Sequence, residues 1–320
     1  MEDKEHTKSP WPGPAGLIPV TSGKADDSNL INRRFLDSIT VEMRIIDSVT
    51  PDLSKTLFGR KYASPIMMPA FSHLNKVGKD GRKPMNEYAE AAKALNRLNW
   101  VGMEPDEVYD GIASVGADTV RIIKPFAHHE LILSQMEHAR KMGAVAVGID
   151  IDHVVGKDGR YDIVDGMPLG PVMLDDLKKY VASTPLPFVA KGVLSVQDAL
   201  KCLEAGCKAI VVSHHHGRLP FAVPPLSLLS KIKEVLKGSG MLIFVDCGIN
   251  TGYDAYKALA LGADAVAVGR GILPPLLKEG SKGVVEKLKR MDEELSELML
   301  YTGVKDTNAF DPSVLHGWQA

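Results

Sequence analysis

The sequence predicts an α/β protein folded as a closed (β/α)8 TIM barrel. Short apolar runs rich in valine and isoleucine alternate with amphipathic stretches of ten or more residues between positions 64 and 300. Continuously apolar strands separated by helices indicate a parallel sheet that is covered by helices. Eight such units favour a closed barrel. The main alternative, an open doubly wound sheet, would carry a G-x-G-x-x-G motif after its first strand, and the sequence has no such motif there.

Each expected strand is a short run in which apolar residues stand side by side. In chain order the runs are SPIMMPA (64–70), NWVGM (99–103), DTVRIIK (118–124), AVAVGIDI (144–151), PFVAKGV (187–193), AIVVSHH (209–215), LIFVDCG (242–248) and AVAVGRG (265–271). The helices are expected at 86–98, 105–115, 127–142, 173–183, 196–205, 226–237, 252–261 and 281–300. In the last of these, apolar residues recur every three or four positions, which is the helical period.

The first 30 residues are expected to form a poorly ordered N-terminal tail. Proline, glycine, serine and charged residues dominate there without any periodicity. The opening MEDKEHTKSPWPGPAG has no apolar core, so it does not look like a secretory signal. The barrel is then expected as one domain over residues 31–320.

Composition and charge narrow the class of protein. Hydrophobic residues make up 45% and charged residues 24%, as in a soluble globular protein. The net charge of −2 disfavours nucleic acid as a partner, and no apolar run reaches the ~18 residues of a membrane span. The three cysteines are too few and too scattered for a disulfide framework or a zinc site. We expect them to stay reduced in the cytoplasm.

In a barrel of this kind the chemistry lies at the carboxyl ends of the strands, and the expected strands turn polar there. The residues concerned are Ser72, His73, Arg121, Lys124, Asp150, Asp152, Lys191, the stretch 213–218, Asp246, Gly269 and Arg270. We therefore expect the functional site among them.

The last two units suggest a phosphate site. Gly248 and Gly252 allow a tight turn into a helix with free N–H groups at its start, and Gly269 and Arg270 follow the eighth strand. Barrels commonly hold a phosphate at these loops on backbone amides and a cation. Ordinary turn glycines and a solvated arginine are the alternative.

Lys191, at the end of the fifth strand, has three interpretations. A lysine there is a Schiff-base nucleophile, a fixed positive charge beside an electron-accepting ring, or an ion-pair partner of Asp246. Ion pairing is the simplest of the three.

The stretch VVSHHHGRLP (211–220) ends the sixth strand with three histidines and an arginine. Strand alternation separates neighbouring side chains, so at most two of the histidines can share an ion, and we expect no native metal. For His215 and Arg218 we prefer a proton acceptor beside a two-pronged clamp for a carboxylate. A histidine-rich surface loop is the alternative.

Together these residues resemble the FMN-dependent α-hydroxy-acid oxidases and dehydrogenases, the family of glycolate oxidase and lactate oxidase. The family's sixth-strand motif S-N-H-G-G-R is similar to residues 213–218, and its D-G-G-x-R-x-G is similar to DCGINTG at 246–252. KALALGA, the G-R-G at 269–271 and the Lys-Gly at 191–192 continue the resemblance, which spans roughly residues 32–310.

The resemblance implies FMN as the cofactor and a role for each matching position. His215 would take a proton from the substrate, with Asp150 or Asp246 supporting its charged form, and Arg218 would hold the substrate carboxylate. Lys191 would lie beside the N1–C2 side of the flavin and favour negative charge there. Further cofactor contacts would come from Pro69, Ala70, Phe71, Arg121, Ser213, Asp246, Gly248, Asn250, Gly269 and Arg270.

Several positions depart from the family pattern. His214 replaces an asparagine, His216 and Cys247 replace glycines, and Asn250 replaces a phosphate-binding arginine. The third strand lacks the family's flavin-binding glutamine and its substrate-binding tyrosine, and Arg121 fits either place.

We therefore expect an FMN-dependent oxidoreductase that converts a 2-hydroxy acid, or a related alcohol, to the 2-oxo product. Two alternatives stay open: an FMN enzyme acting on a larger biosynthetic substrate, and a flavin-free barrel that binds a phosphorylated ligand. The expected partner is a small carboxylate-bearing substrate. The resemblance also implies a homo-oligomer, a tetramer or an octamer.

Overall fold

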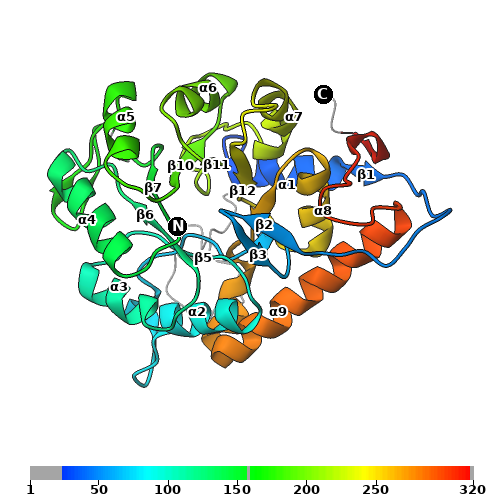
Figure 1. Ribbon diagram of the computed structural model, residues 1–320, viewed down its shortest axis with the longest axis horizontal. Coiled ribbons are helices and arrows are strands. Elements are labelled where there is room, and N and C mark those ends of the chain that lie inside the picture. The colour runs from blue at the N-terminus through cyan, green and yellow to red at the C-terminus, as the bar shows by residue number, and fades with distance from the viewer. Residues whose placement is uncertain (1–23, 157–158, 318–320) are drawn as a thin grey trace, which may run out of the picture.

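A computed structural model describes residues 24–156 and 159–317. Eight parallel strands form one sheet in the order β4–β13–β12–β11–β10–β7–β6–β5. Strands β5, β6, β7, β10, β11 and β12 are labelled in Figure 1. The two outer strands also meet, because the Met68 N–H donates to the Leu98 carbonyl at 3.1 Å and the Gly102 N–H donates to the Phe71 carbonyl at 2.7 Å. The sheet is therefore closed into a barrel, and the predicted fold class is confirmed.

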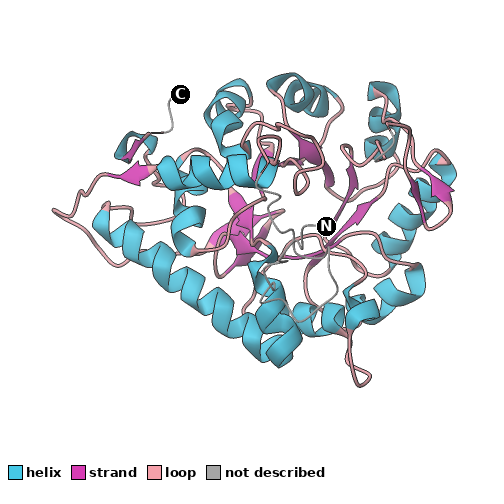
Figure 2. Cartoon of the chain, turned by 180° about the vertical axis from the view of Figure 1, so that it is seen from behind, coloured by secondary structure: helices cyan, strands magenta, loops and turns pink. Residues whose placement is uncertain are grey.

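Every strand of the barrel lies inside the run predicted for it. The strands are β4 (Ile66–Met67), β5 (Asn99–Val101), β6 (Thr119–Ile123), β7 (Ala146–Asp150), β10 (Phe188–Val193), β11 (Ala209–Val212), β12 (Leu242–Val245) and β13 (Ala265–Ala267). The connecting helices are α2 (Pro84–Ala94), α3 (Asp106–Ala113), α4 (His129–Lys141), α5 (Leu174–Ala182), α6 (Val196–Glu204), α7 (Pro225–Val235), α8 (Gly252–Ala260) and α9 (Leu273–Tyr301). They form an outer ring around the strands (Figure 2).

The helices begin where the sequence supplies caps. Ser195 accepts the backbone N–H of Asp198 at the start of α6, and Thr251 and Asp254 form a capping box at the start of α8. Helix α9 begins eight residues before the predicted position 281, and its two parts meet at Gly280, whose φ is 63°. Glycine adopts that left-handed conformation without a steric penalty.

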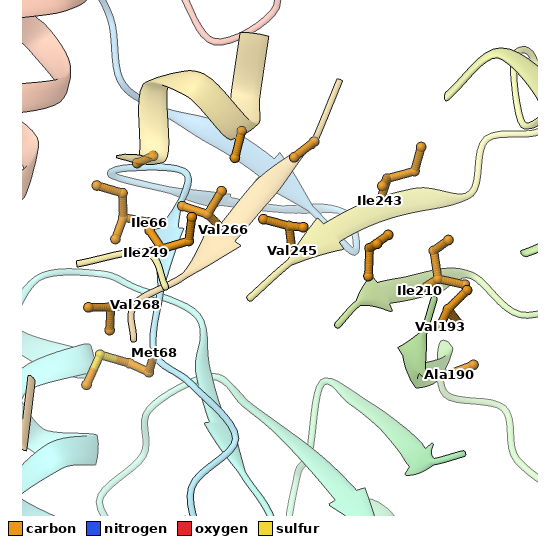
Figure 3. Close-up of a cluster of buried hydrophobic side chains, with 14 of the residues drawn as sticks. Ile66, Met68, Ala190, Val193, Ile210, Ile243, Val245, Ile249, Val266 and Val268 are labelled. Atoms are coloured by element: carbon orange, nitrogen blue, oxygen red, sulfur yellow. The ribbon is translucent and has the colours of Figure 1, made fainter. Parts of the chain in front are cut away.

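Strand alternation divides the core into two layers. One row of side chains, including Ile66, Val245 and Val266, points out toward the helices (Figure 3). The other row, including Ile122 and Phe244, fills the barrel interior. Residues that continue the inward row past the strand ends therefore face the C-terminal end of the barrel, which we call the mouth.

In the described part of the chain, three pairs of short strands lie outside the barrel, and they were not predicted. Strands β2 (Lys55–Leu57) and β3 (Arg60–Tyr62) form a hairpin that closes the N-terminal end, where Phe58 packs edge-on against Phe244 at 5.8 Å. Strands β8 (Ile163–Val164) and β9 (Met167–Pro168) form a hairpin in the loop after β7, and β1 (Thr40–Val41) pairs with β14 (Leu315–His316).

Helix α1 (Ser28–Ser38) begins inside the stretch expected to be a tail. Asp27 caps it, and Asn29 and Asn32 donate to the carbonyls of His216 and Cys247. The helix is thus fastened to the loops at the mouth. The rest of the expected tail, residues 1–23, lies outside the described residues. In the part of the chain that is described, no helix has the length and apolarity needed to cross a bilayer.

Candidate active site

Two lysines share one buried carboxylate at the mouth. Asp150 ends β7, and its Oδ2 lies 2.5 Å from Lys124 Nζ while its Oδ1 lies 2.9 Å from Lys191 Nζ. All three side chains are less than a tenth exposed. Burial alone would raise the pKa of Asp150, but the two ammonium groups hold that pKa well below its usual range. The carboxylate is therefore ionised and fixed between the two lysines; burial lowers the pKa of Lys124, and the charge of Asp150 opposes that shift.

His215 lies in the loop after β11 and is oriented by a second carboxylate. Its Nδ1 lies 2.9 Å from Asp152 Oδ1, and its backbone N–H donates to Ser213 Oγ at 2.9 Å. Burial alone would raise the pKa of Asp152, but the interactions with His215, followed by the charge of Lys191, together lower it. When Nδ1 carries the proton that Asp152 accepts, Nε2 is left with a lone pair for proton transfer.

Gly192 gives Asp152 its place beside His215. The φ of Gly192 is 96°, and a Cβ built there would overlap the Asp152 carboxyl group. Only glycine permits both this backbone conformation and this close approach. The Lys-Gly pair at the end of β10 thus sets a cation and a carboxylate side by side.

Arg218 lies at the rim of the mouth, beyond His215. Its Nη1 donates to the Val155 carbonyl at 3.2 Å, and its Nη2 lies 3.6 Å from Asp162 Oδ2. Asp162 also contacts His153 Nε2 at 3.0 Å, and the rings of His153 and His215 meet edge to face at 5.5 Å. Burial, followed by the charges of Lys124 and Arg218, lowers the pKa of His153 to about 4, so this imidazole is neutral at neutral pH.

The loops after β12 and β13 form the other end of the site. Within the described ranges, no group accepts the backbone N–H of Arg270 or Gly271, and Arg270 makes no ion pair although it is half-buried. A Cβ on Gly269 would lie 2.8 Å from Asn250 Oδ1 and 3.0 Å from the Ile249 carbonyl oxygen. Free amides, an unpaired guanidinium and a glycine where a side chain would be crowded fit a bound phosphate.

The start of α8 is not part of this cradle. The N–H groups of Asn250 and Thr251 donate to Asp254, and the N–H of Gly252 donates to Glu294 at 2.7 Å. The expectation of free N–H groups at this helix is therefore wrong.

Most of the predicted residues come together in these two groups. Ala70, Lys191 and Asp246 line one small cavity at the mouth, together with Trp100. Asn250 packs behind Gly269 at the loops of the last two strands, and Gly248 lies next to the N-terminal helix. Pro69 accepts a hydrogen bond from the Tyr88 hydroxyl through its carbonyl, and Phe71 pairs with Val101.

Arg121 does not join them. Its Nη2 lies 2.7 Å from Asp106 Oδ1, and its guanidinium lies 4.4 Å from the centre of the Tyr109 ring. Strand alternation explains the difference: Ile122 and Lys124 point inward, so Arg121 points outward, toward α3 and α4. The expected flavin contact of Arg121 is corrected, and Lys124, which directly follows β6, is the residue there that faces the mouth.

Two partnerships also differ from expectation. Asp152, not Asp150 or Asp246, contacts His215 most closely, since the distance from His215 Nδ1 to Asp150 Oδ1 is 3.8 Å. Lys191 pairs mainly with Asp150, because its Nζ lies 4.0 Å from Asp246 Oδ2. Alternate side chains of a strand point into the barrel. Continuing this alternation past the strand ends was the signal that could have identified Asp152 and Lys124.

One cluster here has the composition of a metal site. Ligand atoms of Asp150, His153 and His215 lie within 4.8 Å of one another. Both carboxylate oxygens of Asp150 already contact lysine Nζ atoms, so a metal cation would compete with two ammonium groups. The electrostatics favour an electron-rich or anionic ligand.

Comparisons with known proteins identify the relatives of this chain. The family model described as FMN-dependent dehydrogenase matches residues 19–174 and 169–317. An L-lactate oxidase from Roseobacter sp. is 36% identical over 297 residues, which is 82% of this chain and 79% of that protein. The glycolate oxidase of Spinacia oleracea is 27% identical over 325 residues, 89% of this chain and 86% of that one.

Solved structures extend the likeness to the whole fold. A mandelate oxidase with 3,3-difluoro-2-hydroxy-3-phenylpropionic acid superposes with a TM-score of 0.79 at 27% identity, covering 92% of this chain and 90% of that one. A mandelate oxidase variant with a C4a-OH-FMN adduct gives the same TM-score and identity, covering 90% and 91%. The chain belongs to the FMN-dependent dehydrogenase family.

Proposed function

We propose that this protein oxidises a small 2-hydroxy acid to the 2-oxo acid with bound FMN. The observation that carries the proposal is His215, which Asp152 orients at the same mouth that holds Lys191 and Arg218. A proton acceptor, a carboxylate clamp and a cation for the ring are the groups that this oxidation needs. Relatives named as oxidases of lactate, glycolate and 4-hydroxymandelate support it.

The residues at the mouth suit the two ends of FMN. Arg270 and the N–H groups of residues 270 and 271 would hold the phosphate, with Gly248, Gly269 and Asn250 shaping the cradle. Residues 69–71, Ser213 and Asp246 would lie along the rest of the cofactor, and Lys191 beside the N1–C2 edge of its ring. When bound, FMN supplies a two-electron acceptor at N5.

The chain's own groups would then manage the substrate. Arg218 would bind the carboxylate through two N–H groups, and Asp162 and the Val155 carbonyl would orient that fork. His215 Nε2 would take the proton that the substrate loses. Asp152, held against Nδ1, would stabilise the positive charge that the imidazole gains.

A visible spectrum of the purified protein with FMN tests the proposal. We expect a bound flavin whose absorption bleaches when glycolate, lactate or mandelate is added without oxygen. A bound flavin that none of these acids bleaches would favour an FMN enzyme with another, larger substrate. A protein that does not bind FMN at all would support a barrel for a phosphorylated ligand.

Domain extent, location and assembly belong to the same proposal. We infer a single barrel domain over residues 31–320 to which α1 adds residues 28–30, in a cytoplasmic protein that forms a homo-oligomer. The three free cysteines support the cytoplasmic location, and the family resemblance supports the homo-oligomer. Light scattering of the purified protein at several concentrations would measure the assembly state.

A further inference from the structure

We propose that Lys124 is the counter-ion of Asp150, and that it keeps the positive charge of Lys191 available to the reduced flavin. The inference rests on the proposed function, because it places FMN at the mouth. Lys124 directly follows β6 and continues its inward row, and the resembled family carries an uncharged glutamine and an uncharged tyrosine on that strand.

Two of the charged groups lie on the neighbouring strands β7 and β10, and the third directly follows β6. Lys191 of β10 is the register partner of Asp150 of β7, and Lys124 follows Ile123, which pairs with Ile149. Each oxygen of Asp150 therefore faces a different ammonium group, at 2.5 Å and 2.9 Å. Side-chain exposures of 8%, 4% and 7% for Lys124, Asp150 and Lys191 remove most of the solvent that would screen these charges.

The charge balance at the mouth explains why the second lysine matters. Lys191 has two acidic neighbours, Asp150 at 2.9 Å and Asp246 at 4.0 Å, while the Asp152 charge faces His215. A flavin gains negative charge when it is reduced, and a carboxylate close to it would oppose that change. Lys124 cancels the charge of Asp150, so the mouth stays favourable to the reduced ring.

A purely structural salt bridge would give a different result. In that case Lys124 would hold β6 against β7 and its removal would change stability alone. An electrostatic role predicts opposite shifts of the flavin midpoint potential when the positive and the negative partner are removed. The potential thus separates the two interpretations.

The test compares full-length, FMN-loaded protein with Lys124→Met, Asp150→Asn, the double variant and Lys55→Met. Lys55 is a matched control, because it is 11% exposed and lies 3.8 Å from Asp264, whereas its hairpin closes the opposite end of the barrel. Dye equilibration measures the ratio of reduced to oxidised flavin at a fixed potential. We expect Lys124→Met to lower this ratio about tenfold, or about 30 mV for a two-electron couple.

Asp150→Asn should raise the ratio by a similar factor, the double variant should return close to the wild-type value, and Lys55→Met should not change it. Unchanged ratios, or shifts of the same sign in both single variants with FMN still bound, would overturn the inference. If Lys124→Met does not fold, Asp150→Asn compared with Lys124→Gln/Asp150→Asn isolates the same charge, and equal ratios in that pair would overturn it. A wild-type protein that holds no FMN contradicts the proposed function instead.

Discussion

At the scale of single residues, two carboxylates two positions apart have different partners. Asp150 is fixed between Lys124 and Lys191, whereas Asp152 contacts His215. The sequence presents them as equivalent, because both follow the same apolar run. Under the proposed function, Asp152 would support proton transfer and Asp150 the charge balance of the mouth, so substitutions at the two positions should change different measured quantities.

Removing the proposed base should affect flavin reduction and leave the cofactor in place. We expect His215→Ala to slow anaerobic flavin reduction by about 10²–10⁴-fold, the usual contribution of a general base. The affinity for FMN should stay close to that of the wild type, because the proposed phosphate contacts are at Arg270 and Gly271 and not at His215. Stopped-flow absorbance with saturating substrate measures the rate, and a rate equal to that of the wild type would remove His215 from the mechanism.

Asp152→Asn should also slow the reduction, by up to about 10⁴-fold. An amide in place of the carboxylate neither stabilises a charged imidazole nor fixes the proton on Nδ1. Asp162→Asn is the matched control, because Asp162 contacts Arg218 and His153 and not His215. That variant should raise KM more than it lowers kcat, and equal effects of both variants on kcat would contradict the separate roles.

At the scale of elements, the sequence was sufficient for the regular units of the barrel. Strands buried on both faces are continuously apolar, and helices buried on one face are amphipathic. The eight units are therefore visible in the sequence. Helix α1 is different, since its place depends on hydrogen bonds to the Cys247 and Gly248 carbonyls, far away in the chain. Such long-range contacts have no local signal.

The site residues could be predicted where the alternation of side chains along each strand was taken into account. Ser213 and Lys191 continue the inward rows of β11 and β10, and both reach the mouth as expected. Arg121 was misplaced because the family comparison did not decide whether its side chain points into the barrel or outward. The partner of His215 depends on the backbone of Gly192 after β10, which the sequence shows only as a glycine.

The contact between α8 and α9 gives a test at this scale. A Cβ on Gly252, the first residue of α8, would clash with the Met291 carbonyl oxygen and lie 2.5 Å from Leu295 N. Gly252→Ala should therefore destabilise the protein by about 1–3 kcal/mol or more, as overpacking does. Gly111→Ala in α3 is the control, because its nearest neighbour would be Asn86 Nδ2 at 3.6 Å. The control should add about 0.5–1 kcal/mol of stability, and urea unfolding measures both variants.

At the scale of the whole molecule, the barrel is apolar along its length and charged at its mouth. The interior row carries Ile122, Val189 and Phe244, and it ends in lysine and aspartate side chains that are buried with it. Burying neutral histidines near cations also lowers the stability of the folded protein by an amount that depends on pH. The pKa of His153 is lowered to about 4, and that of His216 to about 3, in both cases by burial first and then by nearby cations.

This arrangement predicts a protein that loses stability in mild acid. An unfolded chain binds protons at these histidines near pH 6.5, whereas the folded chain resists protonation until about pH 4, so unfolding is favoured increasingly as the pH falls between these values. For His153, whose side chain is 13% exposed, the loss reaches at most about 3 kcal/mol. The lowered pKa values of Asp150 and Asp152 add instability only below about pH 4, and Glu104, whose pKa burial raises, acts in the opposite sense.

Urea midpoints of the FMN-free protein should fall from pH 7 to pH 4.5, and His153→Gln and His216→Gln should each flatten that dependence. Midpoints that do not change over this range, or variants that keep the full wild-type slope, would show that the two imidazoles are not buried in their neutral form.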